Sequence, residues 1–120
     1  MLHEELTKKI LETCFEVSNE LGAGFLEGVY QNALAIAFNQ KGINAKSKFP
    51  LAVIFRNETV GNYIADFLVE SKVIVEVKAV SALTSEHQAQ VINYLKATGV
   101  EVGLLVNFGT IRLQYKRLHK

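Results

Sequence analysis

The segment Val73–Val80 constrains the fold more than any other part of the sequence, because it reads Val-Ile-Val-Glu-Val-Lys-Ala-Val. A strand this apolar on both faces is typical of the interior of a parallel or mixed sheet that helices cover on both sides. Glu76 and Lys78 interrupt the pattern, and their spacing sends both side chains to the same face of the strand. Burying a charged group is costly unless it is paired or bound to a metal. These two residues are therefore candidates for function.

The remaining periodicities predict the element order ααβββαββ around this strand. Apolar residues spaced by three and four predict helices over 4–21 and 26–41. Ser85 with Gln88 predicts a capping box that starts a third helix, which ends near residue 97. Strands are expected over 46–56, 59–69, 73–80, 102–108 and 110–118. The sequence thus predicts an α/β fold (an α+β arrangement) with a central mixed β-sheet flanked by helices.

Length and composition indicate a single domain over residues 1–120. Of these 120 residues, 49% are hydrophobic and 21% are charged, so the chain can form a core without a disulfide or a structural metal. The only cysteine, Cys14, excludes an internal disulfide and fits a reducing compartment. The longest apolar runs, such as 51–55 and 102–106, are too short to cross a bilayer, and the polar N-terminus does not look like a signal peptide. We therefore expect a soluble cytoplasmic protein.

The net charge of +1 conceals an uneven distribution. Residues 1–30 carry six glutamates and two lysines, whereas residues 31–120 carry eleven basic and six acidic residues. Such an excess of base fits a polyanionic partner such as DNA. A solvated terminal strand that needs charge for solubility explains the end of the chain equally well. The last nine residues contain four basic side chains and no acid: Arg112, Lys116, Arg117 and Lys120.

The hairpin before Val73 decides whether a second carboxylate joins the candidate site. If 70–72 forms a three-residue loop, Val69 pairs with Val73 and Asp66 lies opposite Glu76. A two-residue loop would place the two carboxylates on opposite faces, unless a bulge restored the register. The interpretation of the site therefore depends on the turn.

Asp66, Glu76 and Lys78 together suggest phosphodiester chemistry. Two carboxylates held close together repel each other unless a cation lies between them, and oxygen ligands favour Mg²⁺ or Mn²⁺. Lys78 could then orient or activate a water, or stabilise charge on a phosphate. A buried ion pair of Lys78 with either acid, without catalysis, is the competing explanation.

Asp66 followed after nine residues by Glu76-Val77-Lys78 resembles the core motif of the PD-(D/E)xK nuclease superfamily. The segment Gly24–Tyr30 fits the pattern Gly-x-x-Glu-x-x-Tyr and is similar to the small prokaryotic GxxExxY proteins, in the RecB-like branch of that superfamily. The later segments 90–99 and 102–109 agree as well, so the resemblance covers nearly the whole chain. One departure is Ala65, which stands where many members have a proline. The resemblance implies a restriction-endonuclease-like core.

The resemblance implies roles for the residues of the central motif. Asp66 and Glu76 would bind Mg²⁺ (or Mn²⁺), with the backbone carbonyl of Val77 as a further ligand. Lys78 would be the catalytic lysine.

Three residues on helices are implied by the resemblance and also have simpler explanations. Glu27 matches a glutamate that approaches the metal in RecB-like relatives, yet an acid in the first turn of a helix also complements the helix dipole. Gln90 and Tyr94 match the Gln-x-x-x-Tyr motif of those relatives, and as i,i+4 neighbours they share one helix face. They could equally serve to cap and pack that helix against the sheet.

These expectations lead to one function and one alternative. The function is a metal-dependent nuclease that hydrolyses DNA phosphodiester bonds, with DNA as partner and no membrane. The alternative is a catalytically inactive nuclease-fold module that binds nucleic acid or a protein, which the near-neutral charge favours. Hydrolysis of a different phosphate ester at the same site stays open. Because few residues lie beyond the core, a homodimer or a recruiting protein partner could complete the substrate-binding surface.

Overall fold

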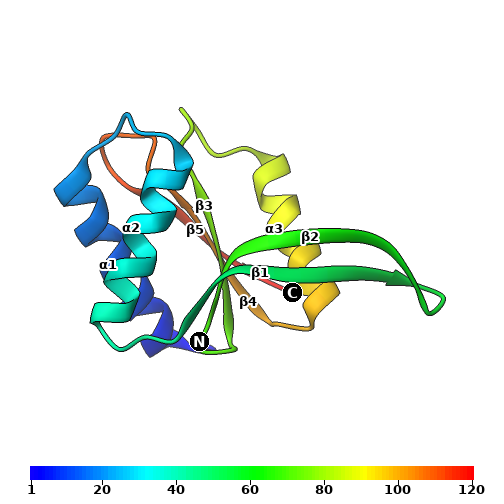
Figure 1. Cartoon of the computed structure of the whole chain (residues 1–120). Helices are drawn as coiled ribbons and strands as arrows, with labels where there is room; N and C mark the ends of the chain where they lie inside the picture. The colour runs from blue at the N-terminus through cyan, green and yellow to red at the C-terminus, as the bar shows by residue number, and fades with distance from the viewer.

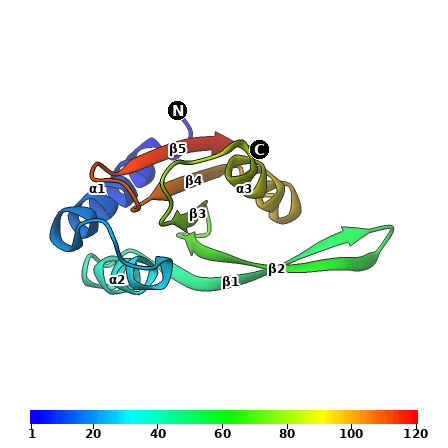
Figure 2. The same ribbon diagram turned by 90° about the horizontal axis from the view of Figure 1, so that it is seen from above.

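A computed structural model describes all residues 1–120 and contains three helices and five strands in the order ααβββαββ. The strands form one sheet in the order β1-β2-β3-β4-β5, with α1 and α2 on one face and α3 on the other (Figure 1 and Figure 2). The expected mixed α/β fold is therefore confirmed. None of the helices has the length and apolarity needed to cross a bilayer. The elements are α1 (Glu4–Leu21), α2 (Glu27–Gln40), β1 (Ala45–Phe55), β2 (Glu58–Val69), β3 (Val73–Lys78), α3 (Ser85–Thr98), β4 (Val102–Asn107) and β5 (Gln114–His119).

The sheet is mixed because β3 and β4 are parallel and joined through α3, whereas the other neighbouring strands are antiparallel. β3 is buried on both faces, as its sequence predicts. Val73, Val75 and Val77 pack into the core beneath α1 and α2, and Ile74 packs into the core beneath α3. Glu76 continues the row of Ile74, so the candidate site lies on the α3 face of the sheet.

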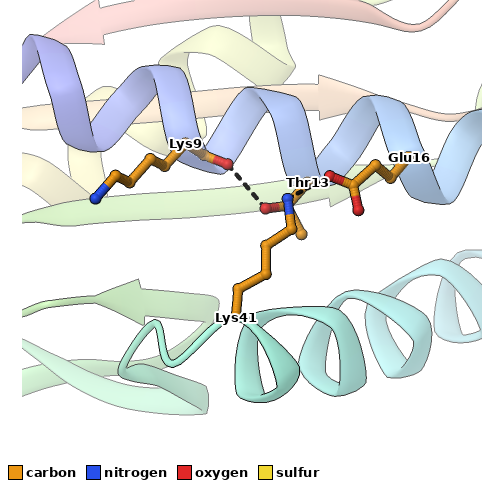
Figure 3. A network of polar contacts seen from close by, with 4 residues as sticks. All are labelled: Lys9, Thr13, Glu16 and Lys41. Atoms are coloured by element: carbon orange, nitrogen blue, oxygen red, sulfur yellow. Dashed lines mark hydrogen bonds and ion pairs between the residues drawn. The ribbon is translucent and has the colours of Figure 1, made fainter.

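Helices α1 and α2 pack side by side over the core that contains Val73, Val75 and Val77. Lys41, which follows α2, forms an ion pair with Glu16 of α1, and the Thr13 hydroxyl donates to the Lys9 carbonyl at 2.8 Å (Figure 3). Beneath this polar surface Cys14 is fully buried, and burial raises the pKa of its thiol to about 12. Cys14 is therefore a core residue, as expected.

The start of α3 differs from the sequence prediction by one residue. The capping box uses Thr84 and His87 in place of Ser85 and Gln88. The Thr84 hydroxyl accepts from the His87 backbone N–H at 3.3 Å, and the Thr84 backbone N–H donates to His87 Nδ1 at 3.0 Å. Threonine and serine both cap helices well, but a capping box usually has Glu or Gln at its last position, so the local pattern favoured Ser85 with Gln88.

Strands β3 and β5 are shorter than expected because the buried side-chain amide of Asn107 hydrogen-bonds the backbone next to them. β3 ends at Lys78, since the N–H and C=O of Val80 bond to the Asn107 side chain, each at 3.0 Å, instead of to a strand. The same amide accepts from the Gly109 N–H at 3.0 Å and donates to Gln114 at 3.1 Å, and β5 begins at Gln114 rather than at residue 110. Asn107 therefore fixes the chain where it leaves β3 for α3.

Replacing Asn107 by alanine should lower the free energy of unfolding by about 2–3 kcal/mol, because the backbone groups of Val80 would lose their partners. Urea unfolding followed by circular dichroism measures this loss. Asn32→Ala, at an exposed position on α2, is the control and should change stability by less than about 0.5 kcal/mol. Equal effects of the two substitutions would show that the amide does not stabilise this junction.

Candidate active site

The candidate site lies where β2 separates from β3. Val69 pairs with Val73, which confirms the three-residue loop over 70–72. The pairing continues to Phe67 and Val75 and then stops. The opening that follows begins at the next position on each strand, where the sequence places its two carboxylates.

Asp66 and Glu76 replace the missing sheet bonds with their own side chains. The Asp66 backbone N–H donates to Glu76 Oε1 at 2.7 Å, and the Val77 backbone N–H donates to Asp66 Oδ2 at 2.7 Å. On the other side of β2, the register with β1 also skips Asp66 and its neighbour Lys48, whose φ is 54°. The predicted proximity of the two acids is therefore realised through an exchange of side-chain bonds rather than through a regular pair.

Burial raises the pKa values of both carboxyls, and the charge of Asp66 raises that of Glu76 further. Glu76 is 4% exposed, and desolvation followed by the charge of Asp66 raises its pKa to about 8. Desolvation also raises the pKa of Asp66, although the hydrogen bond from Val77 and the charge of Lys78 oppose the shift. Without a cation, Glu76 therefore keeps its proton at neutral pH.

Lys78 is directed at α3 and has no acidic partner. Its Nζ donates to Gln90 Oε1 at 3.1 Å, and it forms no ion pair with Asp66 or Glu76. The charge of Lys78 nevertheless opposes the rise in the pKa of both acids, so the ammonium lies within electrostatic reach of them. This geometry argues against a simple buried ion pair, and it leaves the ammonium free to bind another group.

Tyr94 lies one turn beyond Gln90 on the same face of α3. Its pKa is raised by burial and then by the charges of Glu76 and Asp66, which places the hydroxyl near the acid pair. The Tyr94 ring packs 5.8 Å from the ring of Tyr63 on β2. The structure therefore brings both residues of the Gln-x-x-x-Tyr motif to the candidate site.

The segment before α2 is built to fix the start of that helix. Gly24 has a φ of 114°, a conformation that favours glycine. The Tyr30 hydroxyl donates to the Gly22 carbonyl at 2.6 Å and accepts from the Phe25 backbone N–H at 3.2 Å. The Tyr30 ring is buried and stacks on Phe108 at 4.8 Å. The glycine and tyrosine of the Gly-x-x-Glu-x-x-Tyr motif thus have structural roles.

Glu27, the middle residue of that motif, begins α2 beside the site. Partial burial raises its pKa, and the charges of Lys78 and His87 oppose the shift while that of Asp66 adds to it. No group of three His, Cys, Asp or Glu side chains gathers to form a metal cage. Glu27 is therefore near the acid pair but does not join it as a third carboxylate ligand in this conformation.

Gln31 contacts the site and was not singled out from the sequence. Its side-chain N–H donates to the backbone carbonyl of Asp66 at 3.4 Å. It lies one turn after Glu27, so both face the same side of α2. That i,i+4 relation to Glu27 is the signal that could have identified it.

The chemistry of the donors fits a hard divalent cation. Asp66 and Glu76 each bind a backbone N–H through one oxygen, which leaves the second oxygen of each carboxylate for a ligand. Mg²⁺ keeps several waters and is usually held by one or two carboxylates together with substrate phosphates. Burial raises the pKa of both carboxyls, and the charge of Asp66 raises that of Glu76 further, so a cation would stabilise the ionised pair.

The stability of the metal-free protein should fall as the pH rises from about 5 to about 8. The folded protein holds the Glu76 proton up to a pKa of about 8, whereas the unfolded chain releases it near 4.5. The slope is at most about 1.4 kcal/mol per pH unit, the value for one proton. Urea unfolding at a series of pH values with EDTA measures it. Glu76→Gln should flatten the profile, while Glu101→Gln, at an exposed position, should keep it. A Glu76→Gln profile as steep as that of the parent would refute this assignment.

The comparisons with known proteins concern the family and the fold. Residues 4–118 match the family model of the PD-(D/E)XK nuclease superfamily. Among solved structures, the fold is similar to the crystal structure of SSO0001, with a TM-score of 0.63 and 17% sequence identity. That likeness concerns the fold, and it covers 98% of this chain and 59% of the SSO0001 chain. No curated protein matches the sequence. Because the family match spans almost the entire chain, the protein belongs to the PD-(D/E)XK nuclease superfamily.

Proposed function

We propose that the protein is a metal-dependent nuclease that hydrolyses phosphodiester bonds in DNA. The observation that carries this proposal is a pair of carboxylates with raised pKa values beside a lysine that has no acidic partner. Membership of the superfamily supports the same chemistry.

Asp66 and Glu76 would hold Mg²⁺ (or Mn²⁺), with the Val77 carbonyl as a further oxygen ligand. When bound, the cation would stabilise negative charge on the phosphate. The Lys78 ammonium would donate hydrogen bonds to a phosphate oxygen or to the attacking water, and Gln90 would act as a positioning residue that holds it in place.

Glu27 and Tyr94 would contact the water or the substrate from α2 and α3. Each lies close enough to the acid pair for its pKa to be affected. The two helices thus approach the opening from opposite sides, and the substrate would enter between them.

The basic residues at the C-terminus give the DNA part of this proposal no direct support. They lie on and beside β5, an edge strand that β4 separates from β3. Strand alternation puts Lys116 on the α3 face with buried Leu118, and Arg117 on the other face, where it donates to the Leu2 carbonyl. The choice of DNA rests instead on the site chemistry and on the family.

We also propose the finer assignment to the GxxExxY proteins of the RecB-like branch, which are prokaryotic, and a cytoplasmic location. The local roles of Gly24, Glu27 and Tyr30, and the convergence of Gln90 and Tyr94 on the site, support the assignment. The buried, unpaired Cys14 is compatible with a reducing compartment.

Calorimetric titration should show that the protein binds Mg²⁺ or Mn²⁺ at one site, with or without a DNA oligonucleotide. Asp66→Asn and Glu76→Gln should each abolish this binding, because each removes one of the two carboxylate ligands. Glu101→Gln should bind as the parent does. A flat titration for the parent in the presence of DNA would contradict the proposed metal site.

Lys78→Ala should lower the rate of DNA cleavage at least about 100-fold, since the ammonium would no longer stabilise the reacting phosphate or water. Cleavage of linear, circular and branched DNA with Mg²⁺ or Mn²⁺ measures this loss, and Lys72→Ala in the exposed β2–β3 loop is the matched control. If the parent binds metal and DNA but cuts none of these substrates, the inactive module is the correct function. Equal cleavage by Lys78→Ala and the parent would remove Lys78 from the mechanism.

A further inference from the structure

The outer part of the β1–β2 hairpin forms an arm, residues 51–64, whose tip extends beyond the helices (Figure 1 and Figure 2). At its base, Leu51 is buried in the core beneath α3 and Tyr63 packs on Tyr94. Four apolar side chains of the arm are exposed: Ile54 and Phe55 at 58%, Ile64 at 60% and Val60 at 61%. A two-stranded hairpin is marginally stable in water on its own, and exposed apolar surface of this kind marks an interaction site. The exposed part of the arm is therefore a candidate interaction surface.

The backbone of the arm offers an open edge. β1 is the first strand of the sheet, so one side of it has no neighbour. The inner half of β1 contains residues that discourage pairing with another strand: Lys46, Lys48 with its φ of 54°, and Pro50. The outer half, Leu51–Phe55, reads Leu-Ala-Val-Ile-Phe and has neither charge nor proline. The nearby shift in register adds its extra residue, Val60, to β2, so this half of β1 stays regular.

The opposite edge of the sheet shows what a protected strand looks like in this protein. β5 is short and places Lys116 and Arg117 at its centre. Charged side chains of this kind keep an edge from pairing with another chain. The contrast indicates that the open segment of β1 is suited to pairing.

We propose that Leu51–Phe55 pairs antiparallel with the same segment of a second copy of the chain, across a two-fold axis. All five side chains of the segment are apolar, so two copies of it can pair without placing a charge opposite an apolar group. Pairing centred on Val53 sets Leu51 opposite the second copy's Phe55, and Ala52 opposite its Ile54. Backbone bonds would supply the affinity, and the apolar contacts would set the register.

Charge favours this partner over a nucleic acid. The only charged residues of the arm are Arg56 and Glu58, so its net charge is zero and it does not attract a polyanion. An uncharged apolar strand fits another uncharged apolar strand.

One substitution can remove the open edge without touching the β1–β2 bonds. Pro50 pairs with Ile64 and has no N–H, so its nitrogen faces away from β2. Ala52, two residues later, has the same orientation, and its N–H points to the open edge. Ala52→Pro therefore deletes a donor that only a second copy would use.

Sedimentation velocity of the full chain over a wide concentration range, without metal or DNA, tests the proposal. We expect reversible dimers, with self-association at least tenfold weaker in Ile54→Lys and in Ala52→Pro. Ile36→Lys, 61% exposed on α2, is matched in residue type and exposure and should associate as the parent does.

A parent protein that stays monomeric at every concentration would overturn the proposal. So would a dimer that both arm variants retain, or one that Ile36→Lys weakens equally. Circular dichroism confirms folding of each variant. Ala52→Pro carries the test if Ile54→Lys fails to fold, because it introduces no charge.

Discussion

Asp66 and Glu76 accept hydrogen bonds from backbone N–H groups at the point where β2 and β3 separate. These bonds allow the sheet to stay paired up to Phe67 and Val75 and to open directly beyond them. Where β2 leaves β3, the N–H groups of Asp66 and Val77 lose their partners in the strand. An unpaired buried N–H costs about 1–3 kcal/mol, and here a carboxylate oxygen accepts each one. The bonds that end the ladder are therefore the bonds that hold the acids together. Substituting either acid perturbs the sheet and the site at once, so the isosteric amides are the informative variants.

The elements around this opening each contribute one or two polar contacts, and their positions are set by residues outside the site. Gly24 and Tyr30 fix the first turn of α2, and Gln31, one turn after Glu27, donates to the Asp66 carbonyl of β2. Asn107 anchors the chain as it leaves β3 toward α3, which carries Gln90 to Lys78. The site thus depends on two separate junctions, each stabilised by hydrogen bonds of buried polar groups in addition to the apolar cores.

The sequence predicted the parts of this arrangement that repeat with a local period. The apolar row of β3, the face shared by Glu76 and Lys78, and the register across the 70–72 loop all follow from alternation and loop length. The parts that it missed depend on contacts between distant residues. Asn107 ends β3 through bonds to Val80, and Gln31 of α2 donates to Asp66 of β2, so the members of each pair lie far apart in the sequence. The predicted capping box was wrong for another reason: Ser85 with Gln88 fits the usual pattern, whereas the box that forms one residue earlier has a histidine at its last position.

The inner half of β1 flanks the candidate site, whereas the outer half carries the open edge. Lys48 lies beside Asp66, so the protected half of the edge is the half that flanks the candidate site. In antiparallel pairing about Val53 the two β1 strands run in opposite directions. The inner end of the second copy's β1 would therefore lie beyond the tip of the first copy's arm. The two helical bodies would then lie at opposite ends of a continuous sheet. Each opening between β2 and β3 would stay uncovered, so the apolar arm could be buried without blocking either site.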